Sequence, residues 1–357
     1  MRKVNGVNVK MTPAVGGAAY FFLIACYLVL SLAGQGVLRA AGVTDGVLFY
    51  AVNFFLPVIA AAAVIVETVL KSGAGLNAAA LKKTVKIAPS APAYFLAAIL
   101  AGAGMIAGLG FVNQLVADAM TGAGLNAAET DLPLGNSSEL ALFTVFAAFL
   151  PAAAEECFFR GLLLNCLTGG NKGDFKTDAS AVFVSALCFA VYHGSLAQTA
   201  YQFIYGALLA FLTLKAGGIL PAFIAHFMNN FAVLIISYAR LNIDLTNGIT
   251  IAIGLTLAAA AIALIFLCGR KKPRNVKDGE KRAYSGAEKG EDKNAEKGGN
   301  DNGEKGENES GEKRGKGVTD KERSEKNELK IFSFFFPFGA AGIAVCAILI
   351  ICSAVAV

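Results

Sequence analysis

Long apolar stretches recur along most of this chain, and their length predicts helices rather than strands. A helix that crosses the hydrocarbon core of a bilayer needs roughly 20 apolar residues. Nine stretches approach or exceed this length, with eight spans as the alternative because the fifth and sixth are short and nearly continuous. The expected spans are 16–38, 48–70, 93–117, 140–168, 179–195, 197–214, 217–238, 249–268 and 331–357. The predicted fold class is therefore all-α, a polytopic transmembrane helical bundle.

Basic residues are distributed unequally between the two sets of loops that this pattern creates. Cytoplasmic loops of membrane proteins carry an excess of Lys and Arg. One set of connections holds Arg2, Lys3, Lys10, Lys71, Lys82, Lys83, Lys86, Lys172, Lys176, Lys215 and the cluster 270–272, whereas the other holds only Arg39 and Arg240. The sequence therefore predicts a multi-pass protein of the cell membrane with a cytoplasmic N-terminus.

Charge is concentrated in one segment near the C-terminal end. Of the 57 charged residues, 33 lie between residues 270 and 330. This Lys/Glu/Gly-rich segment has too few large apolar residues to offset its chain entropy, so we expect a disordered cytoplasmic linker. The remaining 296 residues are too apolar for a soluble globular enzyme, and the net charge of +5 supplies no basic face for nucleic acid.

The pattern divides the chain into five parts. Residues 1–137 are expected to form N-terminal transmembrane helices, and residues 138–238 a helical core with the candidate chemistry. Residues 239–269 hold a further transmembrane helix, 270–330 the linker and 331–357 a C-terminal transmembrane helix.

Few ionisable residues fall inside the expected spans, and charges in a membrane tend to mark function because they are costly there. Glu155, Glu156 and Arg160 lie in the fourth span, His193 in the fifth and His226 in the seventh. These two histidines are the only ones in the chain. The polar residues of this core are therefore the candidate site.

Helix geometry gives these residues different partners. Glu156 and Arg160 are four residues apart on one helix face and can neutralise each other. Glu155 points about 100° away and needs a partner from another helix. Depths counted along the spans let Glu155, His193 and His226 meet near mid-membrane, with Asn230 one turn beyond His226.

Such a pocket is suited to the activation of water. A carboxylate paired with an imidazole accepts a proton from water, and a second imidazole with a carboxamide donates to a developing oxyanion. Glu155, His193 and His226 could instead hold a divalent metal such as Zn²⁺, because Glu and His are zinc ligands. Taken singly, each of these residues can also have a purely structural role. For the Glu156–Arg160 pair, the structural role is the expected one.

Three motifs give these residues a family context. The patterns are Glu-Glu-x-x-x-Arg at 155–160, Phe-x-x-x-His at 189–193 and His-x-x-x-Asn at 226–230. In this order and on separate spans, they resemble the motifs of the type II CAAX prenyl endopeptidases, also called the CPBP or Abi family. The resemblance covers about residues 138–238 and implies an intramembrane endopeptidase.

The resemblance also implies roles for the matched positions. Glu155 would activate water that His193 helps to position, while His226 and Asn230 would stabilise the oxyanion. The supporting positions are Glu156, Arg160 and Phe189. The choice between a glutamate-type enzyme and a zinc metalloprotease stays open at the level of sequence.

Two other function classes remain as alternatives. A transporter could use the same polar residues as a proton-coupled pathway, although no inverted repeat is visible between the halves of the chain. A non-catalytic immunity or scaffold protein could retain them for stability. The expected partners are a peptide or protein substrate at the membrane and the lipid bilayer, without nucleic acid.

Overall fold

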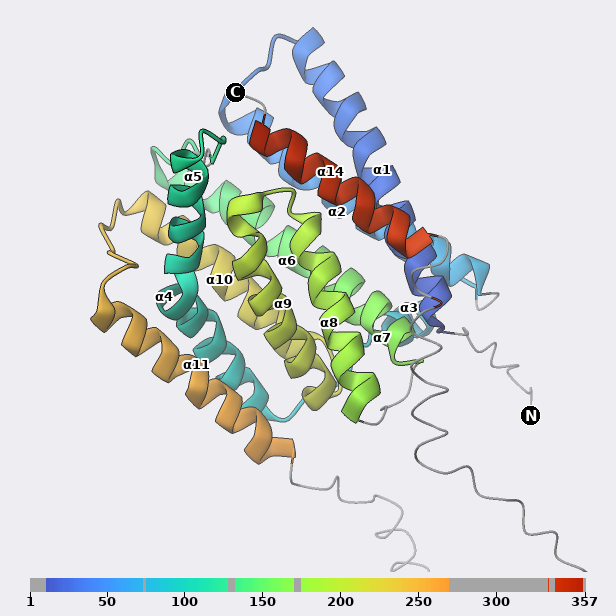
Figure 1. Cartoon of the computed structure of the whole chain (residues 1–357). Helices are drawn as coiled ribbons and strands as arrows, with labels where there is room; N and C mark the ends of the chain where they lie inside the picture. The colour runs from blue at the N-terminus through green and yellow to red at the C-terminus, as the bar shows by residue number, and fades with distance from the viewer. Residues whose placement is uncertain are drawn as a thin grey trace, which may run out of the picture.

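The computed structural model describes residues 11–72, 75–127, 132–169, 175–269, 333 and 338–355. Within these residues every regular element is a helix (Figure 1). The all-α fold class predicted from the apolar stretches is therefore confirmed. The linker predicted for 270–330 lies outside the described residues, so its expected disorder stays a prediction.

In the part of the chain that the structure describes, nine helical rods correspond one to one to the nine predicted spans. Eight are single helices: α1 (Pro13–Ala40), α2 (Gly46–Lys71), α4 (Pro92–Gly122), α8 (Phe175–Tyr192), α9 (Leu196–Ala216), α10 (Leu220–Tyr238), α11 (Gly248–Gly269) and α14 (Ala340–Val355). The ninth is a composite of α5 (Ser137–Phe143), η1 (Thr144–Phe149), α6 (Leu150–Glu155), η2 (Glu156–Leu163) and α7 (Leu164–Leu167). A short helix, α3 (Ala78–Thr84), follows α2.

Six of the described helices are long and apolar enough to cross a bilayer, namely α1, α2, α4, the composite helix, α10 and α11. Shorter apolar helices lie at 178–192 within α8 and at 340–355 in α14. The multi-pass membrane character predicted from hydropathy is thereby supported. The last predicted span, 331–357, is represented by the 16-residue helix α14.

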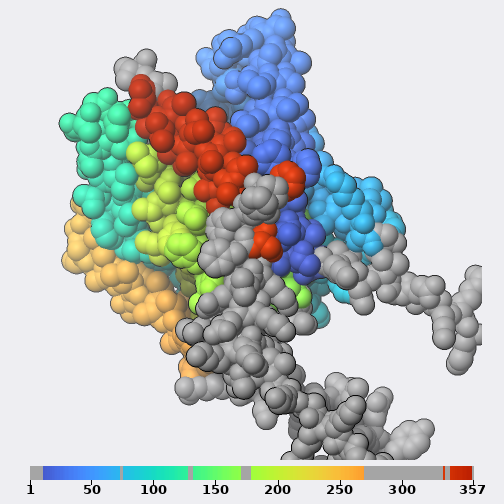
Figure 2. Space-filling model, turned by 45° about the vertical axis from the view of Figure 1, so that its right-hand side comes forward, coloured from blue at the N-terminus to red at the C-terminus, as the bar shows by residue number. Residues whose placement is uncertain are grey.

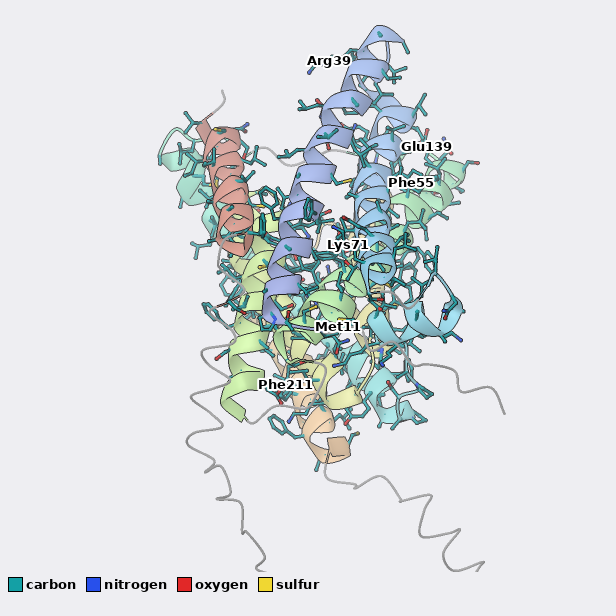
Figure 3. The ribbon with its side chains drawn as sticks, turned by 90° about the vertical axis from the view of Figure 1, so that its right-hand side faces the viewer. Met11, Arg39, Phe55, Lys71, Glu139 and Phe211 are labelled. Atoms are coloured by element: carbon teal, nitrogen blue, oxygen red, sulfur yellow. The ribbon has the colours of Figure 1, made fainter. Side chains whose placement is uncertain are left out.

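Successive rods run in alternating directions, so the connections gather at two ends of the bundle (Figure 1). The α1–α2 connection and the C-terminal end of α14 lie toward one end, and α3 and the last turn of α11 toward the other. Figure 3 shows Arg39 at the first end, with Lys71 farther toward the second. This arrangement agrees with the alternation of basic loops, while the assignment of one end to the cytoplasm stays a prediction.

Glycines allow α4 to pack closely against α11. A Cβ added to Gly108 would lie 2.8 Å from the backbone carbonyl carbon of Gly254, and one on Gly104 would lie 2.6 Å from the backbone nitrogen of Ala258. Small residues let helix backbones approach in lipid, where van der Waals contact drives association. α4 also contacts α9 and α10, which places it behind the helices that carry part of the site.

The composite helix switches from α-helical to π-helical hydrogen bonding at two places. Proline lacks the N–H that would bond to the carbonyl four residues earlier. The π-helical η1, whose hydrogen bonds close at i→i+5, ends just before Pro151, and a second π-helical segment begins at Glu156. The two carboxylates of the first motif therefore lie at a junction between α- and π-helical geometry.

The span predicted for residues 179–195 ends earlier than expected. α8 stops at Tyr192, and Gly194 has a φ of +66°, a conformation that glycine adopts without steric cost. His193 consequently lies in the tight turn between α8 and α9 rather than inside a span. Because α8 and α9 pack against each other, this turn is the tip of a helical hairpin.

Candidate active site

Three elements bring one carboxylate and both histidines together. Glu155 is the last residue of α6, His193 follows α8 and His226 lies in α10. Oε2 of Glu155 is 3.8 Å from Nε2 of His226 and 4.0 Å from Nε2 of His193. The meeting expected from helix depth is thus observed, although His193 reaches it from a turn.

The partners of the two Nδ1 atoms define how each imidazole is oriented. Nδ1 of His193 lies 2.9 Å from the carbonyl oxygen of Phe189, which can only accept, so this nitrogen donates. Nδ1 of His226 lies 2.8 Å from Oε1 of Glu156, an oxygen that also accepts from Arg160. With both Nδ1 atoms occupied as donors, both Nε2 atoms face Glu155.

Glu156 and Arg160 form a fully buried ion pair. Nη1 of Arg160 donates to Oε1 of Glu156 at 2.7 Å, and neither side chain is exposed. Nη2 of Arg160 donates to the carbonyl oxygen of Gly206 at 3.3 Å, which links the pair to α9. The i,i+4 pairing was predicted, whereas the second bond of Glu156, to His226, was not.

Phe189 packs between the charged and the imidazole groups. Its ring centroid lies 4.1 Å from Cζ of Arg160, a cation–π distance. It also meets His193 and His226 edge to face, at centroid distances of 4.6 and 5.6 Å. Phe189 is completely buried, so it places apolar atoms against the two imidazoles. Hydrogen bonds and ion pairs are electrostatically stronger in such surroundings than in water.

Two tyrosines of the same region were not predicted from the sequence, whereas Asn229 was expected as a possible hydrogen-bond partner between helices. The hydroxyl of Tyr201 donates to Oδ1 of the buried Asn229 at 2.6 Å. Tyr205 lies edge to face with His226 at 6.1 Å, and its buried hydroxyl has no hydrogen-bond partner among the described residues. The available signal was the spacing of four residues between two tyrosines in an apolar helix.

Among the described residues, Asn230 is hydrogen-bonded to Asn229 and not to the carboxylates or the histidines. It follows His226 by four residues in α10, and its Oδ1 accepts from Nδ2 of Asn229 at 3.4 Å. Its own Nδ2 makes no hydrogen bond in the part of the chain that the structure describes. The donor predicted for an oxyanion therefore lies on the helix of His226, and no hydrogen bond joins it to Glu155 within the described ranges.

Glu155 and His193 are more exposed than the other charged and imidazole side chains of the site. The side chains of Glu155 and His193 are 14% and 19% exposed, against 4% for His226 and none for Glu156 and Arg160. Oε2 of Glu155 is itself buried and has no hydrogen-bond partner within the described residues. Oε2 of Glu155 and Nε2 of both histidines thus converge on one place in the site.

A carboxylate and two imidazoles are the ligand set of many catalytic zinc sites. Bonds of about 2.1 Å would put two ligand atoms of a tetrahedral ion about 3.4 Å apart, which is closer than the separations of 3.8 and 4.0 Å observed around Glu155. No group of three His, Cys, Asp or Glu residues in the described ranges is arranged to hold a metal ion. The residues as placed do not fit zinc, whereas a water with hydrogen bonds of about 2.8 Å spans such gaps.

α14 supports the turn that carries His193. Oγ of Ser353 donates to the carbonyl oxygen of Gly194 at 3.2 Å. The hydroxyl of Tyr20 in α1 donates to the carbonyl oxygen of Cys188 at 3.2 Å and lies 3.5 Å from Sγ of Cys346 in α14. Figure 2 shows α14, in red, lying across the surface between α1 and the α8–α9 hairpin.

Together, the bundle and this buried cluster define a polytopic membrane protein with an acid–imidazole site in its interior. Residues 137–232 match the family model described as Type II CAAX prenyl endopeptidase Rce1-like. The resemblance stated from the three motifs is thereby confirmed over this region, which runs from α5 into α10. A search of curated proteins and a search of solved structures each found no match.

Proposed function

We propose that this protein is an intramembrane endopeptidase that hydrolyses a peptide bond with a water molecule activated by Glu155. The family match over residues 137–232 supports a protease. The observation that carries the mechanism is the unpartnered Oε2 of Glu155, which faces Nε2 of both histidines.

The first step uses Glu155 as the base. A water between Oε2 of Glu155 and Nε2 of His193 donates one hydrogen bond to each, because both atoms are acceptors when His193 is neutral. This leaves a lone pair of the water oxygen for the substrate carbonyl carbon. As that C–O bond forms, the water gives a proton to Glu155.

His226 is the candidate electrophile. Its Nδ1 already donates to Glu156, so donation from Nε2 to an oxyanion requires the imidazolium form. Ionised Glu155, Glu156 and Arg160 together carry one negative charge, which a protonated His226 balances inside the membrane. Nδ2 of Asn230 supplies the second donor to the oxyanion.

Collapse of the tetrahedral intermediate returns the site to its starting state. The carbonyl re-forms as the C–N bond breaks, and the proton held by Glu155 moves to the leaving amine. The products are a carboxylic acid and an amine, and transfer of the acid's proton to the amine then gives the carboxylate and the ammonium ion. No metal or covalent enzyme intermediate enters this sequence of steps.

The substrate class is a peptide segment at the membrane. The matched family is named for prenylated CAAX substrates, and a prenylated C-terminal peptide is therefore one arm of the test. Unmodified membrane-protein tails and leader peptides form the other arms. The predicted orientation would present such segments from the cytoplasmic side.

The experiment reconstitutes wild type, Glu155→Gln and Glu67→Gln in liposomes with peptide pools of these classes and follows products by mass spectrometry. Glu67 on α2 is the matched control because its carboxylate pairs with Lys71, away from the site. We expect cleavage by wild type and Glu67→Gln, and a loss of about 10²- to 10⁴-fold in Glu155→Gln.

Cleavage by Glu155→Gln at the wild-type rate would refute the proposed base. A chelator arm tests the metal question separately, and we expect the cleavage rate to be unchanged. If none of the three proteins cleaves any peptide pool, and Glu155→Gln abolishes proton-coupled solute flux, the transporter hypothesis replaces the protease hypothesis.

A further inference from the structure

An apolar groove runs along the helix turn that carries the site. It has a volume of about 340 Å³ and ten lining residues from α2, α3, α6 and the residues that follow α3 and α6. Val58 and Val66 mark its extent on α2, which is about 12 Å at the helical rise. Ala154 and Cys157, which flank the two carboxylates of the first motif, line its other wall.

Two exposed lysines follow a residue of α3 that lines this groove. Leu81 of α3 lines the groove, whereas the next two residues, Lys82 and Lys83, are exposed in the last turn of the same helix. Exposed Leu76 and Ile87 flank α3 on either side. Exposed apolar and basic residues together are typical of a segment at the interface of a bilayer.

We propose that this groove binds an acyl chain of an anionic phospholipid whose phosphate lies against Lys82 and Lys83. The groove is apolar throughout and lies between helices that are long enough to span a membrane, so it suits a hydrocarbon chain. Basic residues beside a membrane span attract anionic headgroups. A phospholipid has both an acyl chain for the apolar groove and an anionic phosphodiester for the lysines. An uncharged prenyl thioether fits the apolar groove but offers the lysines no negative charge.

The proposal does not depend on the proposed protease activity. The test incubates the full chain in detergent with equal amounts of phosphatidylglycerol and phosphatidylcholine of the same chain length, and native mass spectrometry counts the retained lipid. Wild type should retain phosphatidylglycerol in preference. Lys82→Gln and Lys83→Gln should each reduce that retention by about fivefold.

The groove itself is tested with a matched pair of variants on α2. Ala62 and its neighbour Ala63 are both exposed, but only Ala62 lines the groove. Ala62→Trp should lose the lipid, and Ala63→Trp should retain it. Val66→Trp serves as a second groove-filling variant in case Ala62→Trp does not fold, and Arg39→Gln at the other end of the bundle is the charge control.

Three results would overturn the proposal. The first is wild-type lipid retention by folded groove-filling variants. The second is equal retention of the two lipids by wild type, which would remove the headgroup assignment. The third is displacement of the lipid from wild type by a farnesylated peptide that Ala62→Trp fails to bind, because the occupant would then be a lipid-modified peptide.

Discussion

At the scale of single residues, one oxygen atom joins the structural and the chemical parts of the site. Oε1 of Glu156 accepts from both Arg160 and His226. Arg160 in turn packs on Phe189, whose carbonyl oxygen fixes His193. A change at either member of the ion pair therefore reaches both imidazoles.

Removal of Arg160 should destabilise the protein strongly. Arg160→Ala leaves the Glu156 carboxylate buried without its cation, at a cost of about 3–5 kcal/mol. Thermal unfolding in detergent measures the effect against Lys71→Ala, whose exposed ion pair contributes little. Equal melting temperatures of Arg160→Ala and wild type would show that the pair does not stabilise the fold.

Loss of the Glu156 charge should affect catalysis more than binding. Glu156→Gln preserves the shape of the side chain but weakens the acceptor that orients and charges His226, so we expect kcat to fall about 10- to 100-fold with KM nearly unchanged. Steady-state kinetics on a cleaved peptide separate the two constants. A rise in KM with wild-type kcat would assign Glu156 to substrate binding instead.

The sequence predicted which residues meet but not every bond between them. Both histidines and Glu155 were found because ionisable residues are rare in apolar helices. The bond from Glu156 to His226 was missed because ideal α-helical geometry turns Glu155 and Glu156 about 100° apart. Glu156 begins a π-helical segment, whose wider turn the apolar pattern does not reveal.

At the scale of helices, close backbone contact positions the elements behind the site. The α4–α11 crossing depends on glycines, whose missing side chains allow the two backbones to meet. The apolar stretches predicted these helices through their length alone. They did not predict which helices pack together, or that α14 supports the turn after His193, because packing in lipid depends on individual side-chain shapes.

A methyl group at this crossing should separate the helices. Gly108→Ala introduces a Cβ 2.8 Å from the backbone of Gly254 and should cost about 1–3 kcal/mol. Gly36→Ala on α1 is the matched control, because its Cβ would meet nothing within 4 Å. Thermal unfolding compares the two, and equal stabilities would contradict the packing argument.

At the scale of the whole molecule, the two ends of the bundle differ in charge. Arg39 in the last turn of α1 and Arg240 just after α10 lie at one end, and Lys71, Lys82 and Lys83 lie toward the other. This asymmetry predicts the orientation in the membrane through the excess of basic residues on the cytoplasmic side. The family match and the fold do not determine this orientation.

Epitope insertion tests that orientation. A tag between Arg240 and Gly248, in the α10–α11 connection, should be accessible from outside intact cells. A tag beside Asn77, in the connection before α3, should become accessible only after permeabilisation. The reverse pattern would place the N-terminus outside and the lysine-rich end away from the cytoplasm.

The central claim is that Glu155 and His193 act on the same water molecule, and a double-mutant cycle tests it most directly. Residues that act as a unit have strongly non-additive effects on rate. Initial cleavage rates are measured for wild type, Glu155→Gln, His193→Gln and the double variant in the same liposomes. The account predicts that the double variant cleaves no more slowly than Glu155→Gln alone. A double-variant rate equal to the product of the two separate losses would show that the residues act independently, and would contradict the shared water.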